Sequence, residues 1–248
     1  MTQPKTTQAK TMDRANALDV IDLTAGYGRI EVLHGVSFSV PVGSVVALLG
    51  PNGAGKTTTL NCIAGILDPM GGHVHIGGHH LNGEAPDRLA RAGLCTIPEG
   101  RGIFPNLSVE ENISLFAYAA KAAPKEIEER SFSQFPRLAE RRTQLAGRLS
   151  SGEQQMLAMA RALSSDPALL LLDELSMGLA PKIVEDLYEI VGEIGRQGVS
   201  VLVVEQFARR ALAVAQLGIV MVQGRVTAIG EPADIEGELS AAYLGGAA

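Results

Sequence analysis

The chain has 248 residues, of which 46% are hydrophobic, and its formal net charge at pH 7 is −6. This length and composition suit one large α/β domain and exclude a wholly disordered chain. The negative charge disfavours a nucleic-acid interface. No apolar run approaches the roughly 20 residues that span a bilayer. Residues 1–16 are polar, so we expect a disordered tail, no signal peptide and a cytoplasmic protein.

Apolar patterning predicts two kinds of strand in the first quarter of the chain. Alternation begins at Val20, breaks at the turn Gly26–Gly28 and then resumes, which indicates antiparallel strands joined by a hairpin. Val45–Leu49 is continuously apolar, as expected for a strand that is buried on both faces. A glycine-rich loop follows it, and a helix is predicted from Thr58 to Ile66.

Residues 100–165 are more charged and have helical patterning, whereas the chain after Ala168 alternates apolar runs with helical segments. This alternation is typical of a largely parallel sheet. We therefore predict one α/β domain over residues 17–248. It would contain an antiparallel β subdomain and an α-helical subdomain inserted at about residues 100–165.

The segment Gly50–Thr57 fits the P-loop pattern G-x-x-x-x-G-K-T. Glycines let backbone N–H groups close around a phosphate chain, and the following helix adds the positive end of its dipole. Lys56 can then reach the β- and γ-phosphates of ATP, and the Thr57 hydroxyl is placed for Mg²⁺. A chance match is the alternative, but a predicted strand and helix flank the loop. The predicted nucleotide-binding residues here are Gly50, Pro51, Asn52, Gly53, Ala54, Gly55, Lys56, Thr57 and Thr58.

Asp173 and Glu174 directly follow the apolar run Leu169–Leu172. A buried strand would deliver them to its carboxyl end, where open α/β sheets bind ligands. Asp173 is therefore a predicted Mg²⁺ ligand, and Glu174 is placed to act as the general base that polarises the attacking water. A solvated acidic turn is the alternative, but the P-loop upstream favours the functional interpretation.

Ser150 and Glu153 have the spacing of a capping box at the start of a helix. A well-capped helix is one interpretation of this segment. The other is that its N-terminal N–H groups and the Ser150 hydroxyl contact an anion.

These elements, in this order, resemble the nucleotide-binding subunits of ABC transporters. Gly50–Thr57 matches the Walker A loop, Leu149–Glu153 the signature motif and Leu169–Glu174 the Walker B strand. The resemblance covers about residues 18–244 and implies a P-loop NTPase core of the ABC ATPase type that binds ATP and Mg²⁺. Tyr27 falls where this family stacks an aromatic ring on adenine.

Three phrases resemble one subgroup of that family, the LivF type, which serves the import of branched-chain amino acids. They are Ile97–Arg101, Asp173–Pro181 and Val204–Gln206. Related importers carry urea or short amides, so these solutes are an alternative.

The resemblance also implies partners. Two ATPase subunits would pack head to tail, so that Ser150, Gly152 and Glu153 of one contact the nucleotide of the other. The second subunit is either a LivG-like ATPase or a copy of this chain. Both would dock on two integral membrane permease subunits, and an extracytoplasmic solute-binding protein would act indirectly. The chain would thus be peripheral on the inner face of the cell membrane.

Five residues depart from the common family pattern, which are Glu99, Ser151, Leu175, Ala180 and Gln206. Glu99 stands where most members have a glutamine that touches Mg²⁺ and the attacking water, and Gln206 replaces the switch histidine. Both are predicted catalytic residues, and Glu99 is also a predicted metal ligand. Ser151 adds a side chain where the signature backbone meets phosphate. A nucleotide-dependent switch with low turnover is therefore a further alternative.

Four histidines gather at His73, His75, His79 and His80. The first two would share one face of a strand, so a metal site is conceivable. A solvated hairpin is the favoured interpretation, because no cysteine or carboxylate stands among them.

Overall fold

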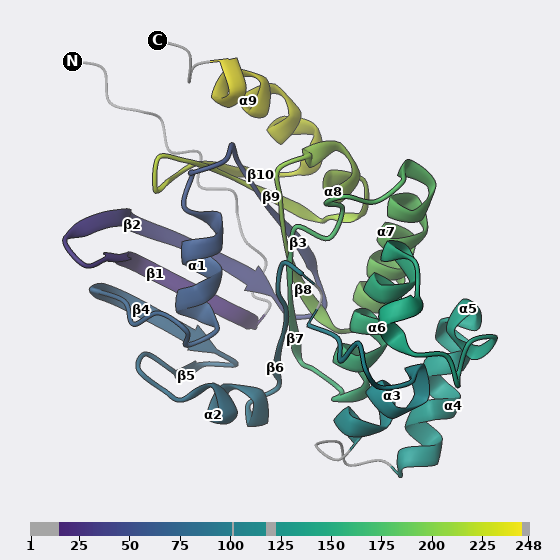
Figure 1. The fold of residues 1–248 in the computed structure, drawn as a ribbon. Coiled ribbons are helices and arrows are strands. Elements are labelled where there is room, and N and C mark those ends of the chain that lie inside the picture. Colours follow the sequence, from purple (N-terminus) through teal and green to yellow (C-terminus); the bar gives the residue numbers. More distant parts are fainter. Residues whose placement is uncertain (1–14, 101, 118–122, 245–248) are drawn as a thin grey trace, which may run out of the picture.

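The computed structural model describes residues 15–100, 102–117 and 123–244 (Figure 1). The predicted disordered tail lies outside this part of the chain except for its last two residues. Strand β1 already begins at Asn16.

The first sheet is antiparallel, with its strands in the order β2-β1-β4-β5. The strands are β1 (Asn16–Tyr27), β2 (Ile30–Pro41), β4 (Gly71–Ile76) and β5 (His79–His80). Because side chains alternate between the two faces of a strand, Leu18, Val20 and Phe38 are buried on one face of this sheet. The prediction of an antiparallel β subdomain is confirmed.

The second sheet is the centre of the molecule, with its strands in the order β10-β9-β3-β8-β7-β6. Strands β9, β3, β8, β7 and β6 are parallel, and β10 pairs antiparallel at one edge. The strands are β3 (Val45–Leu49), β6 (Leu94–Ile97), β7 (Leu169–Asp173), β8 (Ser200–Glu205), β9 (Leu217–Val222) and β10 (Arg225–Gly230).

The helices cover both faces of the central sheet or form a separate lobe beside it (Figure 1). They are α1 (Lys56–Ile63), α2 (Pro86–Arg91), α3 (Val109–Ala117), α4 (Pro124–Gln134), α5 (Pro136–Ala139), α6 (Ser151–Ser164), α7 (Pro181–Arg196), α8 (Ala208–Val214) and α9 (Pro232–Leu244), with a 3₁₀ turn at Ala146–Arg148. Helix α1 contacts β1 and β2 on one side and β7 on the other, so it lies between the two sheets. Helices α3, α4 and α5 form a lobe at the opposite end of the molecule from β1 and β2 (Figure 1).

Two hydrophobic cores share the central sheet. Val46 and Leu48 of β3 point into the core that contains α1 and the antiparallel sheet. Val45, Ala47 and Leu49 point into the core formed with the helices of the other face. A strand with a core on each side must be apolar at every position, which explains the uninterrupted run that predicted β3. The predicted α/β class, with its inserted helical subdomain, is confirmed.

Helix α1 begins two residues earlier and ends three residues earlier than predicted. Gly55, with φ of 101°, adopts the left-handed backbone that only glycine enters readily, and its carbonyl accepts a hydrogen bond from the Thr59 N–H at 2.9 Å. The helix therefore starts directly at Lys56. At the other end, Gly65 has φ of 68° and turns the chain away.

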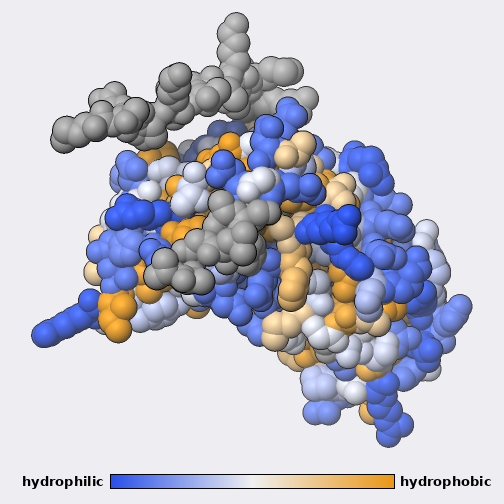
Figure 2. Space-filling model, turned by 90° about the horizontal axis from the view of Figure 1, so that it is seen from above, coloured by the Kyte–Doolittle hydropathy of each residue, from blue (hydrophilic) through white to orange (hydrophobic). Residues whose placement is uncertain are grey.

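Seen from above, hydrophilic residues dominate the visible surface, and hydrophobic residues form small separate patches between them (Figure 2). Among the described residues, no helix combines the length and the hydrophobicity needed to cross a bilayer.

Candidate nucleotide site

Four neighbouring parallel strands of the central sheet end at the same edge. The P-loop follows β3, Gln206 follows β8, Asp173 ends β7 just before Glu174, and Glu99 comes two residues after β6. The register places Leu49 beside Glu205 and Asp173 beside Val204, so the four strand ends are level. The fold thus brings the predicted Walker A, Walker B, Gln206 and Glu99 positions to one edge, where α/β sheets bind ligands.

The P-loop curves around a pocket of about 230 Å³. Its lining combines loop residues with Glu174, and the predicted residues in it are Asn52, Gly53, Gly55, Lys56, Thr57, Thr58 and Glu174. Gly53 has φ of 79°, and a Cβ on Gly50 would lie 2.2 Å from the Met221 carbonyl oxygen. Glycine is therefore required at both positions for this tight curve.

Lys56 is the basic residue that lines this pocket. Its ammonium group donates hydrogen bonds to the carbonyl oxygens of Gly50 at 2.8 Å and Pro51 at 3.2 Å, and the residue is only 5% exposed. Burial lowers the pKa of Lys56, while the negative charges of Glu174 and Asp173 oppose that shift. The two carbonyl groups thus hold the ammonium beside the pocket. When phosphate binds there, the ammonium can donate to phosphate oxygens in place of these carbonyl oxygens.

Asp173 is the acidic residue of the site whose pKa burial shifts most clearly. Burial, together with repulsion from Glu174 and Glu99, raises its pKa to about 6, and the charge of Lys56 opposes the shift. Its Oδ1 atom is buried without a hydrogen-bond partner. A buried carboxylate oxygen without a partner, in a pocket that adjoins the one lined by Thr57, is a hard oxygen donor that Mg²⁺ can use together with phosphate oxygens and water, so Asp173 fits that ion.

The raised pKa of Asp173 predicts a stability difference. The folded protein holds the Asp173 proton to higher pH than the unfolded chain does, so its stability falls as pH rises from 3.8 towards 6. Above pH 6 the full penalty, about 3 kcal/mol at 1.36 kcal/mol per pKa unit, applies. In protein free of nucleotide and metal, Asp173→Asn should therefore raise the melting temperature at pH 7.5 by several degrees and have little effect at pH 4.

Differential scanning fluorimetry across this pH range checks that expectation. Asp87→Asn is the control, because the Asp87 side chain is 62% exposed and its replacement should shift no melting temperature. A loss of stability in Asp173→Asn at every pH would contradict the assignment of an unsatisfied buried charge.

A second pocket of about 230 Å³ adjoins the first at Glu174. It brings together the predicted residues Glu99, Asp173 and Glu174, together with Gln155 of α6. Gln155 is 5% exposed, and its presence at the site was not predicted. The residues around it form an ordinary amphipathic helix. The one sequence signal for its role was a polar amide at a position of that helix where an apolar side chain is expected.

Gln206 and Tyr27 lie near the site but line neither of these two pockets. Gln206 directly follows β8 and is half-buried. Tyr27 ends β1, is 52% exposed, and its hydroxyl accepts a hydrogen bond from Asn61 Nδ2 at 3.5 Å. Asn61 lies one helix turn after Thr57, so this contact places the exposed ring beside α1, where it can stack on a planar base.

The signature segment forms the predicted capping box at the start of α6. The Ser150 hydroxyl accepts the Glu153 N–H, and Glu153 Oε2 accepts the Ser150 N–H at 2.8 Å. Arg141 Nε lies 2.6 Å from Glu153 Oε1 and balances its charge. A Cβ on Gly152 would lie 2.5 Å from the Ile183 side chain, so this glycine also allows α6 to pack on α7. None of these residues lines the two pockets beside the P-loop.

Another residue that the sequence did not single out is Glu205, the last residue of β8. It is 1% exposed and accepts hydrogen bonds from Ser176 and Tyr188. Ser176 and Tyr188 are 29 and 17 residues away from Glu205 in the chain, so no local sequence pattern indicates these contacts.

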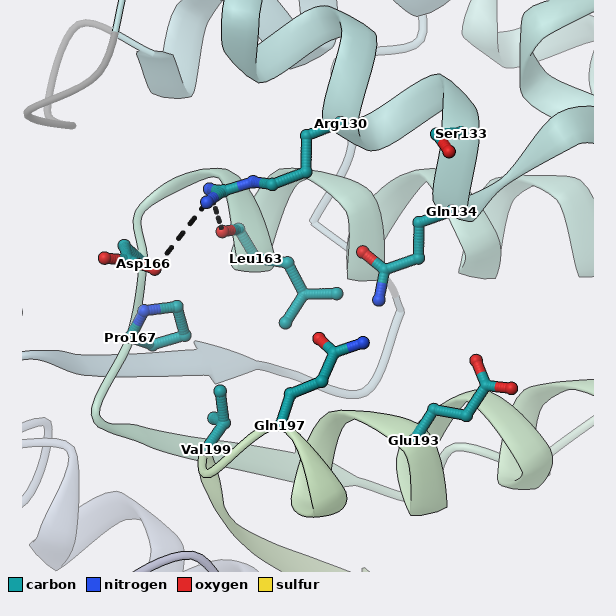
Figure 3. A pocket seen from close by; sticks show the side chains of 9 residues that line it. All are labelled: Arg130, Ser133, Gln134, Leu163, Asp166, Pro167, Glu193, Gln197 and Val199. Carbon is teal, nitrogen blue, oxygen red and sulfur yellow. Dashed lines mark hydrogen bonds and ion pairs between the residues drawn. The ribbon is translucent and has the colours of Figure 1, made fainter.

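A further hollow lies away from this edge. It has a volume of about 450 Å³ and lies between α4, the end of α6 and the end of α7 (Figure 3). Its charged lining is Arg130, Asp166 and Glu193, and Arg130 is already paired with Asp166 at 3.8 Å. It contains no predicted site residue and lies near Val199, at the opposite ends of the parallel strands.

The histidine segment forms the favoured hairpin. His73 and His80 share a hydrogen bond of 3.1 Å between ring nitrogens. Within the described ranges, no group of three or more His, Cys, Asp or Glu residues is placed to hold a metal ion.

Comparison with known protein families shows which family has this arrangement of site residues. Residues 33–176 match the family described as ABC transporter. The chain belongs to this family. As an ABC ATPase it binds ATP or ADP, and it hydrolyses ATP in a reaction coupled to transport.

Individual relatives of this ABC ATPase refine the comparison. It is 41% identical to the high-affinity branched-chain amino acid transport ATP-binding protein BraG of Pseudomonas aeruginosa, over 89% of this chain and 96% of BraG. It is 34% identical to the probable branched-chain amino acid transport ATP-binding protein LivF of Archaeoglobus fulgidus, over 84% and 89% of the two chains. The lipopolysaccharide export system ATP-binding protein LptB of Acidithiobacillus ferridurans is 31% identical over 88% and 91%.

The ADP conformation of an ATP-binding cassette of an ABC transporter superposes with a TM-score of 0.82 at 25% identity, over 95% of this chain and 100% of that one. The predicted membership in the ABC family, with its resemblance to the LivF type, is confirmed.

Proposed function

We propose that this chain hydrolyses ATP to power the import of branched-chain amino acids. Its 41% identity to BraG over nearly the whole of both chains carries the proposal. The name of LptB, which is an export protein, shows why the family alone does not identify the solute.

In the proposed reaction, ATP lies along the P-loop with its adenine against Tyr27. Backbone N–H groups within residues 52–58 and the Lys56 ammonium bind the phosphates. Glu174 takes the proton of the attacking water, because its side chain lines both adjoining pockets at the end of β7. The Gln206 amide donates a hydrogen bond to the γ-phosphate but cannot exchange a proton.

Thr57, Asp173 and Glu99 are the proposed Mg²⁺ ligands. The orphaned, buried Oδ1 atom of Asp173 supports this role. When bound there, Mg²⁺ would neutralise negative charge on the phosphate oxygens.

Ser150, Gly152 and Glu153 are proposed to act on the nucleotide of a second subunit. They lie at the N-terminus of α6 and outside both pockets beside this chain's own P-loop. A LivG-like ATPase is the proposed second subunit, with a second copy of this chain as the alternative. Through two permeases the pair would be peripheral on the inner face of the cell membrane, and a solute-binding protein would deliver the solute from outside.

Uptake by reconstituted vesicles tests the proposed function. The vesicles contain this chain, its partner ATPase, both permeases and the binding protein, and ATP is supplied on the side of the ATPase subunits. Radiolabelled leucine should accumulate, and unlabelled isoleucine or valine should compete with it. If the vesicles took up urea or acetamide but not leucine, the proposed solute would be wrong. ATP binding with no uptake and no turnover would instead support the low-turnover switch that Glu99, Ser151 and Gln206 suggest.

A further inference from the structure

A fully buried carboxylate lies beneath the turn that carries Glu174. Glu205 Oε1 accepts hydrogen bonds from the Ser176 N–H at 2.9 Å and from the Tyr188 hydroxyl at 2.8 Å. Its Oε2 accepts the Ser176 hydroxyl at 2.9 Å. Glu205 therefore joins three elements, which are the end of β8, the turn after β7 and helix α7.

The turn that Glu205 holds has an unfavourable backbone. Glu174 has φ of 48°, a left-handed conformation that residues with a side chain adopt only when their surroundings impose it. Its own N–H donates to the Val204 carbonyl at 2.9 Å, and its carbonyl accepts the Met177 N–H at 3.2 Å. Two residues further on, both the N–H and the hydroxyl of Ser176 are bound to Glu205. These bonds tie both sides of the strained residue to β8.

The hydrogen bonds match an ionised acceptor. Burial raises the pKa of Glu205, and the hydrogen bonds from Tyr188 and Ser176 oppose that shift. Burial and the negative charge of Glu205 hold the pKa of Tyr188 well above its ordinary value, so its phenol keeps the proton that it donates. Three donors therefore bind one carboxylate, and only the two from Ser176 attach the turn itself to it.

We propose that Glu205 is a positioning residue for ATP hydrolysis, which fixes the strained Glu174 turn against β8 and so aims the Glu174 carboxylate at the attacking water. The inference rests on the proposed role of Glu174 as general base. Glu205 itself does not touch the nucleotide, because the P-loop pocket and the pocket around Glu99 are lined by other side chains.

Two matched variants separate positioning from mere stability. Ser176→Ala and Tyr188→Phe each remove one hydroxyl that donates to the same carboxylate, but only Ser176 lies on the turn. Both should lower the melting temperature. In the full-length chain assembled with its partner ATPase and permeases, Ser176→Ala should lower kcat at least about fivefold and leave the KM for ATP nearly unchanged, because small misplacements of catalytic groups are costly. Tyr188→Phe should keep kcat within about twofold of the original.

Glu205 variants give a second measurement. Glu205→Ala should lower kcat by about tenfold to a hundredfold with little change in the KM for ATP. Glu205→Gln should restore most of that loss, because its amide oxygen can still accept the Ser176 N–H and the Tyr188 hydroxyl.

The proposal is overturned if Ser176→Ala and Tyr188→Phe lower kcat equally. It is also overturned if a folded Glu205→Ala variant hydrolyses ATP at the original rate. Should Glu205→Ala fail to fold, the Ser176 and Tyr188 pair decides alone. Leucine uptake by the original complex tests the proposed function separately, since a wrong solute leaves these ATPase comparisons valid.

Discussion

Replacing Glu174 with glutamine should stop ATP hydrolysis while leaving ATP binding intact. The amide keeps the size of the side chain in the two adjoining pockets, but it cannot accept a proton from water. Loss of a general base lowers turnover by about 10²- to 10⁴-fold. Because the P-loop and Lys56 are unchanged, ATP should still bind and should hold the two subunits together without being consumed.

Two measurements check this result. Phosphate release by the assembled complex should fall to background, and size-exclusion chromatography of the two ATPase subunits without permeases should show a long-lived dimer when ATP is present. Glu189→Gln, at an exposed position on α7, is the control and should behave as the original. If Glu174→Gln hydrolysed ATP at an unchanged rate, Glu174 would not be the base.

Lys56→Met should have the opposite effect, with nucleotide binding lost and the fold retained. Charge-assisted hydrogen bonds contribute about 1.5–3 kcal/mol each, so two bonds from the ammonium to phosphate amount to at least about a hundredfold in affinity. Methionine preserves most of the buried side-chain volume next to the Gly50 carbonyl. Burial lowers the pKa of Lys56 because the charged ammonium is poorly solvated there. Replacing it with methionine removes this desolvation penalty from the folded state.

Titration with a fluorescent ATP analogue measures the affinity, and thermal unfolding without nucleotide measures the fold. Lys182→Met, at a side chain that is 74% exposed, is the matched control and should change neither quantity. An affinity within a few fold of the original would place the phosphates away from Lys56.

The parts of the fold that sequence predicted are those governed by local rules. The run Val45–Leu49 signals a strand with a core on each side, and it is one. The Ser150 and Glu153 spacing signals a capping box, and both of its hydrogen bonds are present. The start of α1 was missed because Gly55 uses a left-handed backbone, and the pattern of side chains does not report backbone sign.

Other parts of the site depend on contacts between distant segments. Glu205 looks like a polar residue at the end of a strand, yet it is buried because Ser176 and Tyr188 close over it. Gln155 lines the pocket of Glu99 only because α6 packs beside β6, the strand that Glu99 follows. The orphaned oxygen of Asp173 likewise follows from tertiary burial. Each of these features needs a partner that periodicity along the chain cannot identify.

The sharing of one sheet by two cores also bears on how this sequence can change over evolutionary time. A helix residue that packs on one face of the sheet can be replaced by a larger or smaller one if its few neighbours adjust. A residue of β3 such as Ala47 lies between neighbours that face opposite cores, so a larger side chain there displaces the strand and disturbs both. The same displacement would move the P-loop that leaves this strand. The strands are therefore expected to be the slowest part of this chain to diverge, because packing and nucleotide chemistry constrain them together.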